Sequence, residues 1–328
     1  MATNIVKGSG RFIKKRLRDF AGDYAIVLVL ILLALVVSVI QPKFFSVQNF
    51  RNILNQISVV GILSCGMTFV ILTGCIDLSV GSMISLAGIV SVTLLDRTGG
   101  VPSIFFTVIL GALIGLVTGL IIGGINGRMG ESFMVTYGMQ SILAALALIV
   151  SGSLFMMVTV SKGIYVEIGK GLNPIYIFIM LVVLCQFLIS KTRFGRNIMF
   201  MGSNPTAARL SGINVRLNTV IVFLLAGMIS ALSGVILASR VMSANPQAGS
   251  GYELDAIASC VVGGISMRGG VGSFINTLIG VAVIGMLGNA LNLMGVGTYM
   301  QMIIRGTVIA AAVTLDLYNK NRRQMGGL

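Results

Sequence analysis

Apolar runs without a single charged residue dominate this chain, and their length is the strongest constraint on its fold. Residues 52–76, 98–127 and 217–239 contain no Asp, Glu, Lys or Arg. A helix needs about 20 mainly apolar residues to cross the hydrocarbon core of a bilayer, so each of these runs can span a membrane. Because 56% of the residues are hydrophobic and only 10% are charged, an ordinary water-soluble domain is excluded.

Ten segments of this kind divide the chain. They are residues 24–40, 52–76, 78–95, 98–127, 132–161, 171–190, 217–239 and 252–267, the run that begins at Gly269, and residues 298–315. The run from Gly269 must turn near Gly295–Gly297, because it is too long for one crossing. We therefore predict an all-α polytopic membrane protein with about ten transmembrane helices. Segment 252–267 is short, and whether it spans fully stays open.

The basic residues between the runs orient the chain. When the N-terminus is placed in the cytoplasm, 16 of the 23 Lys and Arg residues fall in inside segments and six fall outside. The positive-inside rule thus predicts that both termini are cytoplasmic. The first helix is expected to stay uncleaved, since Val39-Ile40-Gln41 offers no small-residue cleavage site. The chain divides into a basic segment 1–23, a transmembrane domain 24–315 and a tail 316–328.

Several classes of site are excluded by composition. The chain has no His, which rules out Ser-His triads and His-ligated metal sites, and it has no GxxxxGK[ST] nucleotide motif of its own. Its basic residues are few and clustered between apolar blocks, so the net charge of +14 reflects topology and not nucleic-acid binding. The four cysteines lack paired spacing, which predicts free buried thiols. We expect no catalytic residue, metal or cofactor.

Small residues recur every fourth position in segment 98–127. Gly111, Gly115, Gly119 and Gly123 share one helix face. Such a face lets two membrane helices approach closely, so this stripe predicts tight packing against a neighbouring helix.

The most informative polar stretch is residues 191–216, which cannot span a membrane. Asn204 can cap a short helix, and Pro205 suits the first helical position. Gly212 can end that helix, with Ile213 as an apolar contact just beyond it. We predict one short helix lying at the inner surface. Taken alone, the same stretch also fits a basic inside loop that only fixes orientation.

This loop resembles the coupling loop of bacterial ABC importer permeases, in particular those of the ribose-type sugar branch. Three further parts of the chain agree with that resemblance in order: residues 66–82, residues 244–258 with their continuation 262–273, and residues 289–302. The coupling loop alone also suits branched-chain amino-acid permeases. The run Ile76-Asp77-Leu78-Ser79-Val80-Gly81-Ser82 favours sugars.

The resemblance implies an ABC importer permease fold in the bacterial inner membrane. Two permease subunits would form one pathway, a separate ATPase pair would bind the coupling loops, and an extracytoplasmic binding protein would deliver a monosaccharide such as ribose. Another aldose, a nucleoside or a branched-chain amino acid stays open as cargo of the same machinery. The coupling role passes to Gly195, Arg196, Gly202, Asn204, Ala207, Ala208, Arg209, Ser211, Gly212 and Ile213. For Arg209, contact with ATPase acids and anchoring to lipid are both open.

An ion-coupled secondary transporter is the alternative from another class. Such a protein usually places carboxylates near the middle of the membrane, whereas the acidic residues here are expected at the ends of spans. Arg305 falls about 10 Å into the last span and is expected to pair with Asp255 or Glu253 at the outer start of segment 252–267. The pair either locks two helices or lines the pathway.

The remaining candidates are polar residues near span ends. Asp77 is expected at an inside turn, either as the cap of span 78–95 or in a polar ring at the pathway exit, with Arg268 at the same level. A neutral sugar needs small, polar or amide groups along its path. By type, the candidate lining residues are Asn245, Gln247, Asn289, Asn292 and Gln301, each of which could equally make a helix–helix hydrogen bond.

Overall fold

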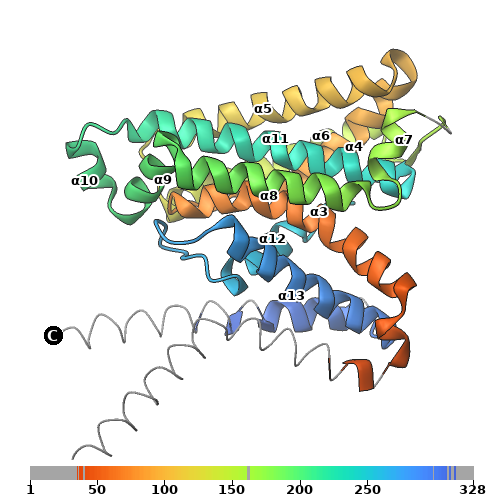
Figure 1. Ribbon diagram of the computed structural model, residues 1–328. Coiled ribbons are helices and arrows are strands. Elements are labelled where there is room, and N and C mark those ends of the chain that lie inside the picture. The colour runs from red at the N-terminus through yellow and green to blue at the C-terminus, as the bar shows by residue number, and fades with distance from the viewer. Residues whose placement is uncertain are drawn as a thin grey trace, which may run out of the picture.

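The computed structural model is an all-helical bundle apart from one two-residue strand pair (Figure 1). It describes residues 35, 37–39, 41–160, 163–297, 299–308, 310–311 and 314. Segments 1–23 and 316–328, and nearly all of the expected first span 24–40, lie outside the described residues. Residues 35 and 37–39 are helical, and a short 3-10 helix, η1 (Pro42–Phe45), follows them ahead of the first long helix.

Seven helices are long and apolar enough to cross a membrane. They are α3 (Val47–Leu72), α4 (Ser79–Thr98), α5 (Gly100–Gly124), α6 (Met129–Ser151), α8 (Asn173–Lys191), α11 (Val215–Val241) and α13 (Phe274–Leu293). Each one falls on a predicted run. Residues 299–308 are also helical, within the predicted last span.

The short predicted span is only half a helix. Helix α12 (Tyr252–Val262) has 11 residues, or about 16 Å at 1.5 Å per residue, which is too short to cross a bilayer. The chain nevertheless passes from one end of the bundle to the other between α11 and α13. It does so as the irregular segment 245–251, which enters from the end of the bundle where α11 finishes, followed by α12.

Contacts at the two ends of α8 establish this crossing. Before α8, helix α7 (Ile164–Gly169) is bound by the last turns of α11, where Ser239 Oγ donates to Tyr165 O at 2.5 Å. After α8, helix α9 (Arg193–Ser203) packs against Gly270, whose N–H donates to Leu72 O at 2.9 Å. Figure 1 shows α7 at one end of the bundle, and α9 and α10 at the other.

The predicted glycine stripe is confirmed as a close helix contact between α5 and α11. A Cβ atom added to Gly115 would overlap the carbonyl oxygen of Phe223, and one added to Gly111 would overlap Ala231. Only hydrogen at these positions lets the two backbones meet. Because lipid gives helices no hydrophobic drive to associate, this contact stabilises the bundle through packing alone.

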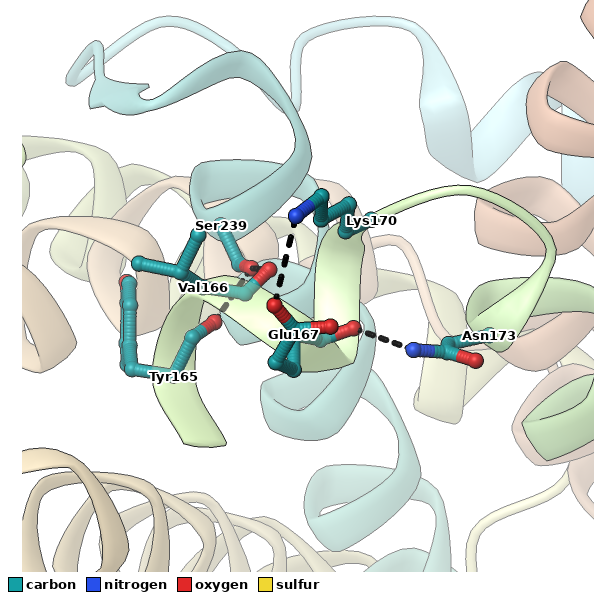
Figure 2. Close-up of polar contacts among 6 residues, drawn as sticks. All are labelled: Tyr165, Val166, Glu167, Lys170, Asn173 and Ser239. Atoms are coloured by element: carbon teal, nitrogen blue, oxygen red, sulfur yellow. Dashed lines mark hydrogen bonds and ion pairs between the residues drawn. The ribbon is translucent and has the colours of Figure 1, made fainter. Parts of the chain in front are cut away.

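Helix α7 lies at one end of the bundle (Figure 1), and Figure 2 shows the contacts that hold it there. Asn173 Nδ2 donates to Glu167 O at 2.7 Å, which ties α7 to the start of α8, while the exposed ion pair Lys170–Glu167 spans 3.4 Å. The Tyr165 hydroxyl lies 2.8 Å from Ser91 Oγ on α4, and burial raises the pKa of Tyr165 to about 12. Strands β1 (Met156–Met157) and β2 (Ser243–Ala244) pair antiparallel at this end.

Helices α3, α4 and α11 form the centre of the bundle, whereas α6 lies at its edge. In the most apolar window of α3, 78% of the residues are buried, against 17% in that of α6. Cys65, Cys75, Cys185 and Cys260 are buried and unpaired, as predicted. The edge position of α6 leaves one of its faces open toward the site described next.

Candidate functional site

A polar cavity of about 490 Å³ lies between α4, α6 and segment 245–251. It is lined by hydroxyl and amide side chains and a few small groups: Ser82, Ser85, Tyr137, Gln140, Ser141, Ala144, Pro246, Gln247 and Ser250. No charged side chain belongs to this lining among the described residues. We call this space the polar cavity. Its chemistry suits a neutral solute rich in hydroxyl groups.

Helix α6 supplies one wall of the polar cavity through a single face. Tyr137, Gln140, Ser141 and Ala144 follow the i, i+3, i+4, i+7 pattern, so their side chains share one side of the helix. The neighbouring stripe of α6 is buried against the chain that leads into α4. There, Thr136 Oγ1 accepts a hydrogen bond from Leu78 N at 3.1 Å.

That hydrogen bond shows how deep α4 begins. Thr136 is the eighth residue of α6, about 10 Å from the N-terminal end of that helix. Helix α4 therefore starts inside the bundle and not at its surface, and Ser82 and Ser85 lie near mid-depth. Irregular backbone at this depth is tolerated because it is buried in protein and hydrogen-bonded.

Segment 245–251 forms the second wall and is held by backbone contacts. Ser85 Oγ accepts a hydrogen bond from Gly249 N at 2.9 Å, and Asn245 Oδ1 accepts one from Gln247 N at 2.9 Å. A Cβ atom on Gly249 would overlap the carbonyl oxygen of Gly81, so glycine is required for this approach. The segment thus lies directly on α4, with main chain against main chain.

Glu253 lies beside the polar cavity at mid-depth. Its Oε1 accepts hydrogen bonds from Gln140 Nε2 at 3.4 Å and from Gly251 N at 3.3 Å. Gln140 is the twelfth of the 23 residues of α6, so this contact places Glu253 level with the middle of that helix. Glu253 therefore begins α12 level with the middle of α6, and not at the end of a long span as the sequence led us to expect. The irregular chain of 245–251 carries the start of α12 inward.

The predicted pairing of Arg305 is confirmed, with Asp255 as its partner. Arg305 Nη1 donates to Asp255 Oδ2 at 2.6 Å, and the carboxylate is the more buried of the two groups. The pair joins α12 to helix 299–308. An Arg at this depth without a partner would be costly in lipid, and the carboxylate compensates its charge.

The predicted lining amides separate into two groups. Gln247 lines the polar cavity, and Asn245 lines an adjacent cavity of about 260 Å³ that also reaches Ser85. The other three make hydrogen bonds elsewhere. Asn289 exchanges side-chain bonds of 2.9 and 3.0 Å with Asn49, and Gln301 donates to Asn292 Oδ1 at 2.9 Å.

Asp77 caps the start of α4, but it stands one residue before the N-cap position. The cap residue of α4 is Leu78, yet Asp77 Oδ1 accepts from Ser79 N at 2.8 Å and from Ser79 Oγ at 2.6 Å. Asp77 is buried, whereas Arg268 is exposed. These two form no ion pair; within the described ranges, the ion pairs are Lys170–Glu167 and Arg305–Asp255.

The loop 191–216 contains two helices where we predicted one. The predicted helix is present as α10 (Pro205–Leu210): Asn204 Oδ1 accepts from Ala207 N at 3.0 Å, and Gly212 adopts φ +79°. Ile213 N donates to Ala208 O at 3.0 Å, which completes the predicted glycine stop. Sequence reasoning missed α9, although Phe194, Ile198 and Met201 recur at helical spacing.

Both helices of the loop have buried residues, but α10 also carries an exposed apolar side chain. Gly195 and Gly202 on α9 point into the bundle, where a Cβ atom would overlap Ile189 O and Leu72 O respectively. Ala208 on α10 is fully buried. Leu210 is instead 85% exposed, and our sequence analysis did not include it. The available sequence signal was a leucine at the last position of a short helix in a polar loop, which is a possible contact for a partner.

A third cavity, of about 250 Å³, lies behind α10. Arg128, Arg209 and Arg216 line it, and no acidic side chain does so among the described residues. Arg209 Nη2 donates to Asn126 Oδ1 at 2.9 Å, which holds α10 to the turn between α5 and α6. We call this space the arginine cavity. Its charge favours an anionic group from outside the chain.

Comparison with known proteins agrees with this arrangement. The family model described as "Branched-chain amino acid transport system / permease component" matches residues 49–313. The chain belongs to this family. It is thus a permease component built of membrane-spanning helices, and not an enzyme. No solved structure matches it.

Individual relatives extend the similarity to nearly the whole chain. The ribose import permease protein RbsC of Escherichia coli K12 is 38% identical over 324 residues, which cover 96% of this chain and 99% of the relative. RbsC of Haemophilus influenzae is 40% identical, over 88% of this chain and 91% of its own length. The L-arabinose ABC transporter permease protein AraH of Azospirillum brasilense is 34% identical, over 91% of this chain and 88% of its own length.

Proposed function

We propose that this chain is the permease subunit of an ATP-driven importer that carries ribose across a bacterial inner membrane. The observation that supports this most directly is the 38–40% identity to ribose import permeases from Escherichia, Haemophilus and Bacillus. The polar cavity adds chemical support, because ribose is neutral and rich in hydroxyls. Hydroxyl and amide groups can exchange hydrogen bonds with such a solute without holding it by charge.

The proposed topology has ten crossings and two cytoplasmic termini. Segment 245–251 and α12 together make the eighth crossing, in place of a continuous helix. The basic segment 1–23, the transmembrane domain 24–315 and the tail 316–328 keep the boundaries that the charge pattern gives.

The proposed pathway lies between two copies of the chain. Helix α6 exposes a large apolar face that includes Met134, Ile142 and Ile149, next to the face that lines the polar cavity. A second copy against that apolar face would close the open side of the polar cavity. An extracytoplasmic sugar-binding protein would approach the opposite end from α10, where α7 lies.

The proposed contact with the ATPase is the loop 191–216. Its exposed coupling residues are Arg196, Asn204, Arg209, Ser211 and Gly212, to which we add Leu210. Gly195, Gly202 and Ala208 have an inward role, since they seat the loop on α8 and on the inner end of α3. Ala207 and Ile213 are partly buried and border both sides.

The test is reconstitution with the ATPase and binding protein encoded beside this chain. ATP-driven uptake of labelled ribose into vesicles is expected, and Leu210→Glu is expected to abolish it along with ATPase binding. We choose Leu210 because it is exposed, whereas a Glu at the buried Ala208 would disrupt folding. Thermal unfolding of the Leu210→Glu permease should match the wild type.

Two results would contradict this proposal in different ways. ATPase binding without ribose uptake would support an ATP-driven importer with a different substrate. Another aldose would then be the first candidate, which the 34% identity to an L-arabinose permease favours. Uptake driven by an ion gradient without any ATPase would indicate a secondary transporter. The mid-depth position of Glu253 removes our sequence-based argument against that class, so family membership now decides between the two.

A further inference from the structure

We propose that Gln140 selects the transported sugar by binding one of its hydroxyl groups, and that Glu253 positions the Gln140 amide for this contact. The inference rests on the proposed function and deepens it. It follows from three observations: a buried carboxylate, an amide with one free end, and the polar cavity into which that amide is built.

Glu253 lies in the wall of the polar cavity, and no cationic side chain forms an ion pair with it among the described residues. Only 7% of the residue is exposed, and Gly81 on α4 leaves room for its carboxylate. Oε2 has no hydrogen-bond partner among the described residues, while Oε1 accepts from Gly251 N and Gln140 Nε2. A charged group at this depth is unfavourable in a membrane, so Glu253 is a candidate for a functional role. Its clearest contact with the polar cavity is the Gln140 amide.

That contact determines which way the amide faces. A carboxylate can only accept hydrogen bonds, so Gln140 must turn its NH₂ group toward Glu253. The carbonyl oxygen of Gln140 is left to accept a hydrogen bond from a sugar hydroxyl. A side chain without an acceptor in place of Glu253 would allow the Gln140 amide to flip, and its NH₂ group would then face the sugar in place of the carbonyl oxygen.

The surroundings provide the rest of a sugar site. Ser82, Tyr137 and Ser141 line the same cavity as Gln140, and each hydroxyl can donate or accept. The volume of about 490 Å³ falls within the roughly 300–1,000 Å³ of small-molecule sites. Gln140 differs from these hydroxyls in having a fixed polarity. A rotating hydroxyl adapts to any sugar, whereas a fixed acceptor discriminates against a sugar that lacks the matching hydroxyl.

The experiment compares uptake of ribose with uptake of its 2-, 3- and 5-deoxy analogues. The complete transporter is used in vesicles, with the same binding protein for every variant, so the preference of the binding protein cancels. For one analogue, Gln140→Leu is expected to reduce the wild-type preference for ribose about tenfold, because the unpaired acceptor disappears.

Glu253→Leu tests the positioning role separately. It removes the oxygen that accepts from the Gln140 amide, so it should reduce preference for ribose over that same analogue and leave the other ratios unchanged. Gln140→Asn, which retains an amide, should fall between wild type and Gln140→Leu. Gln48→Leu is the matched control, since Gln48 is exposed at the start of α3, outside the polar cavity.

Three results would overturn the inference. Unchanged sugar ratios in Gln140→Leu, with only the maximal rate lowered, would make Gln140 a structural residue. Altered ratios in Gln140→Leu but not in Glu253→Leu would remove Glu253 from the proposal. If the wild type transports no pentose with ATP, the proposed function itself fails, and this result is distinguishable because it precedes any comparison of variants.

Discussion

The guanidinium of Arg305 and the carboxylate of Asp255 lie 2.6 Å apart and join two segments that are separated by 50 residues. Their meeting point lies inside the bundle, one turn from the start of α12. Among the described residues, this contact is the one hydrogen bond that links α12, which is only 11 residues long, to helix 299–308. The pair therefore fixes the position of a half-helix that could otherwise shift along its axis.

We expect Asp255→Asn and Arg305→Gln each to lower the unfolding temperature of the permease in detergent. Each change leaves one charge without its partner, so the double variant should be less destabilised than the sum of the two. The coupling energy should be about 1 kcal/mol or more. Lys170→Gln and Glu167→Gln, at the exposed pair on α7, should be nearly additive. Additivity at Asp255 and Arg305 would show that the pair contributes nothing specific.

The α5–α11 contact predicts opposite effects for two glycines of one helix. Gly115→Ala should destabilise the protein by about 1–3 kcal/mol, because its Cβ atom would meet the backbone of Phe223. Gly124→Ala should be neutral or slightly stabilising, because no atom lies within 4 Å of its Cβ position and alanine favours helix. Thermal unfolding of both variants measures the difference. Equal stability would mean that the helices are not in close contact.

Tyr165 predicts a loss of stability at alkaline pH. Its pKa is about 12 in the folded protein and about 10 in an unfolded chain, so the unfolded chain releases the proton first. The free energy of unfolding should thus fall between pH 10 and 12, by up to about 1.4 kcal/mol per pH unit from this group. Tyr165→Phe should remove that contribution, whereas Tyr176→Phe, on an exposed tyrosine, should not. Identical slopes in all three proteins would contradict the assignment.

The arginine cavity predicts salt-dependent binding of the ATPase. Arg209→Gln and Arg216→Gln should each weaken binding and make it less sensitive to salt, because exposed charge pairs are screened by ions. The measurement belongs in nanodiscs of neutral lipid, where anionic headgroups cannot compete. Arg97→Gln, at the far end of α4, serves as the control. Wild-type affinity in the two cavity variants would indicate that these arginines face lipid.

Sequence patterns predicted the long helices and local caps well because both depend on neighbouring residues. The spans followed from apolar runs, and the end of α10 at Gly212 followed from the need for positive φ there. The depth of Glu253 could not be predicted in this way. Depth depends on where the irregular segment 245–251 lies on α4, and that depends on glycines from two distant parts of the chain, Gly81 and Gly249.

At the candidate site, too, the sequence predicted some residues and missed others that depend on distant parts of the chain. Gln247 was predicted as a lining residue because of its amide, but Gln140 was not, since it lies within an apolar helix where amides usually bond to other helices. The spacing of Tyr137, Gln140 and Ser141 on one face was the available signal. In the same way, Asn289 could not be assigned to Asn49 from the sequence, because the two are 240 residues apart.

At the end of the bundle where α9 and α10 lie, Gly202, Leu72 and Gly270 meet through main-chain atoms. A displacement of α9 would therefore act directly on the end of α3 and on the chain at Gly270, because no flexible side chain lies between these main-chain atoms. Such a joint is stiff, and its stiffness does not depend on which side chains surround it. Larger residues at Gly202 or Gly270 would open the joint, while most other substitutions nearby would leave the mechanical connection intact.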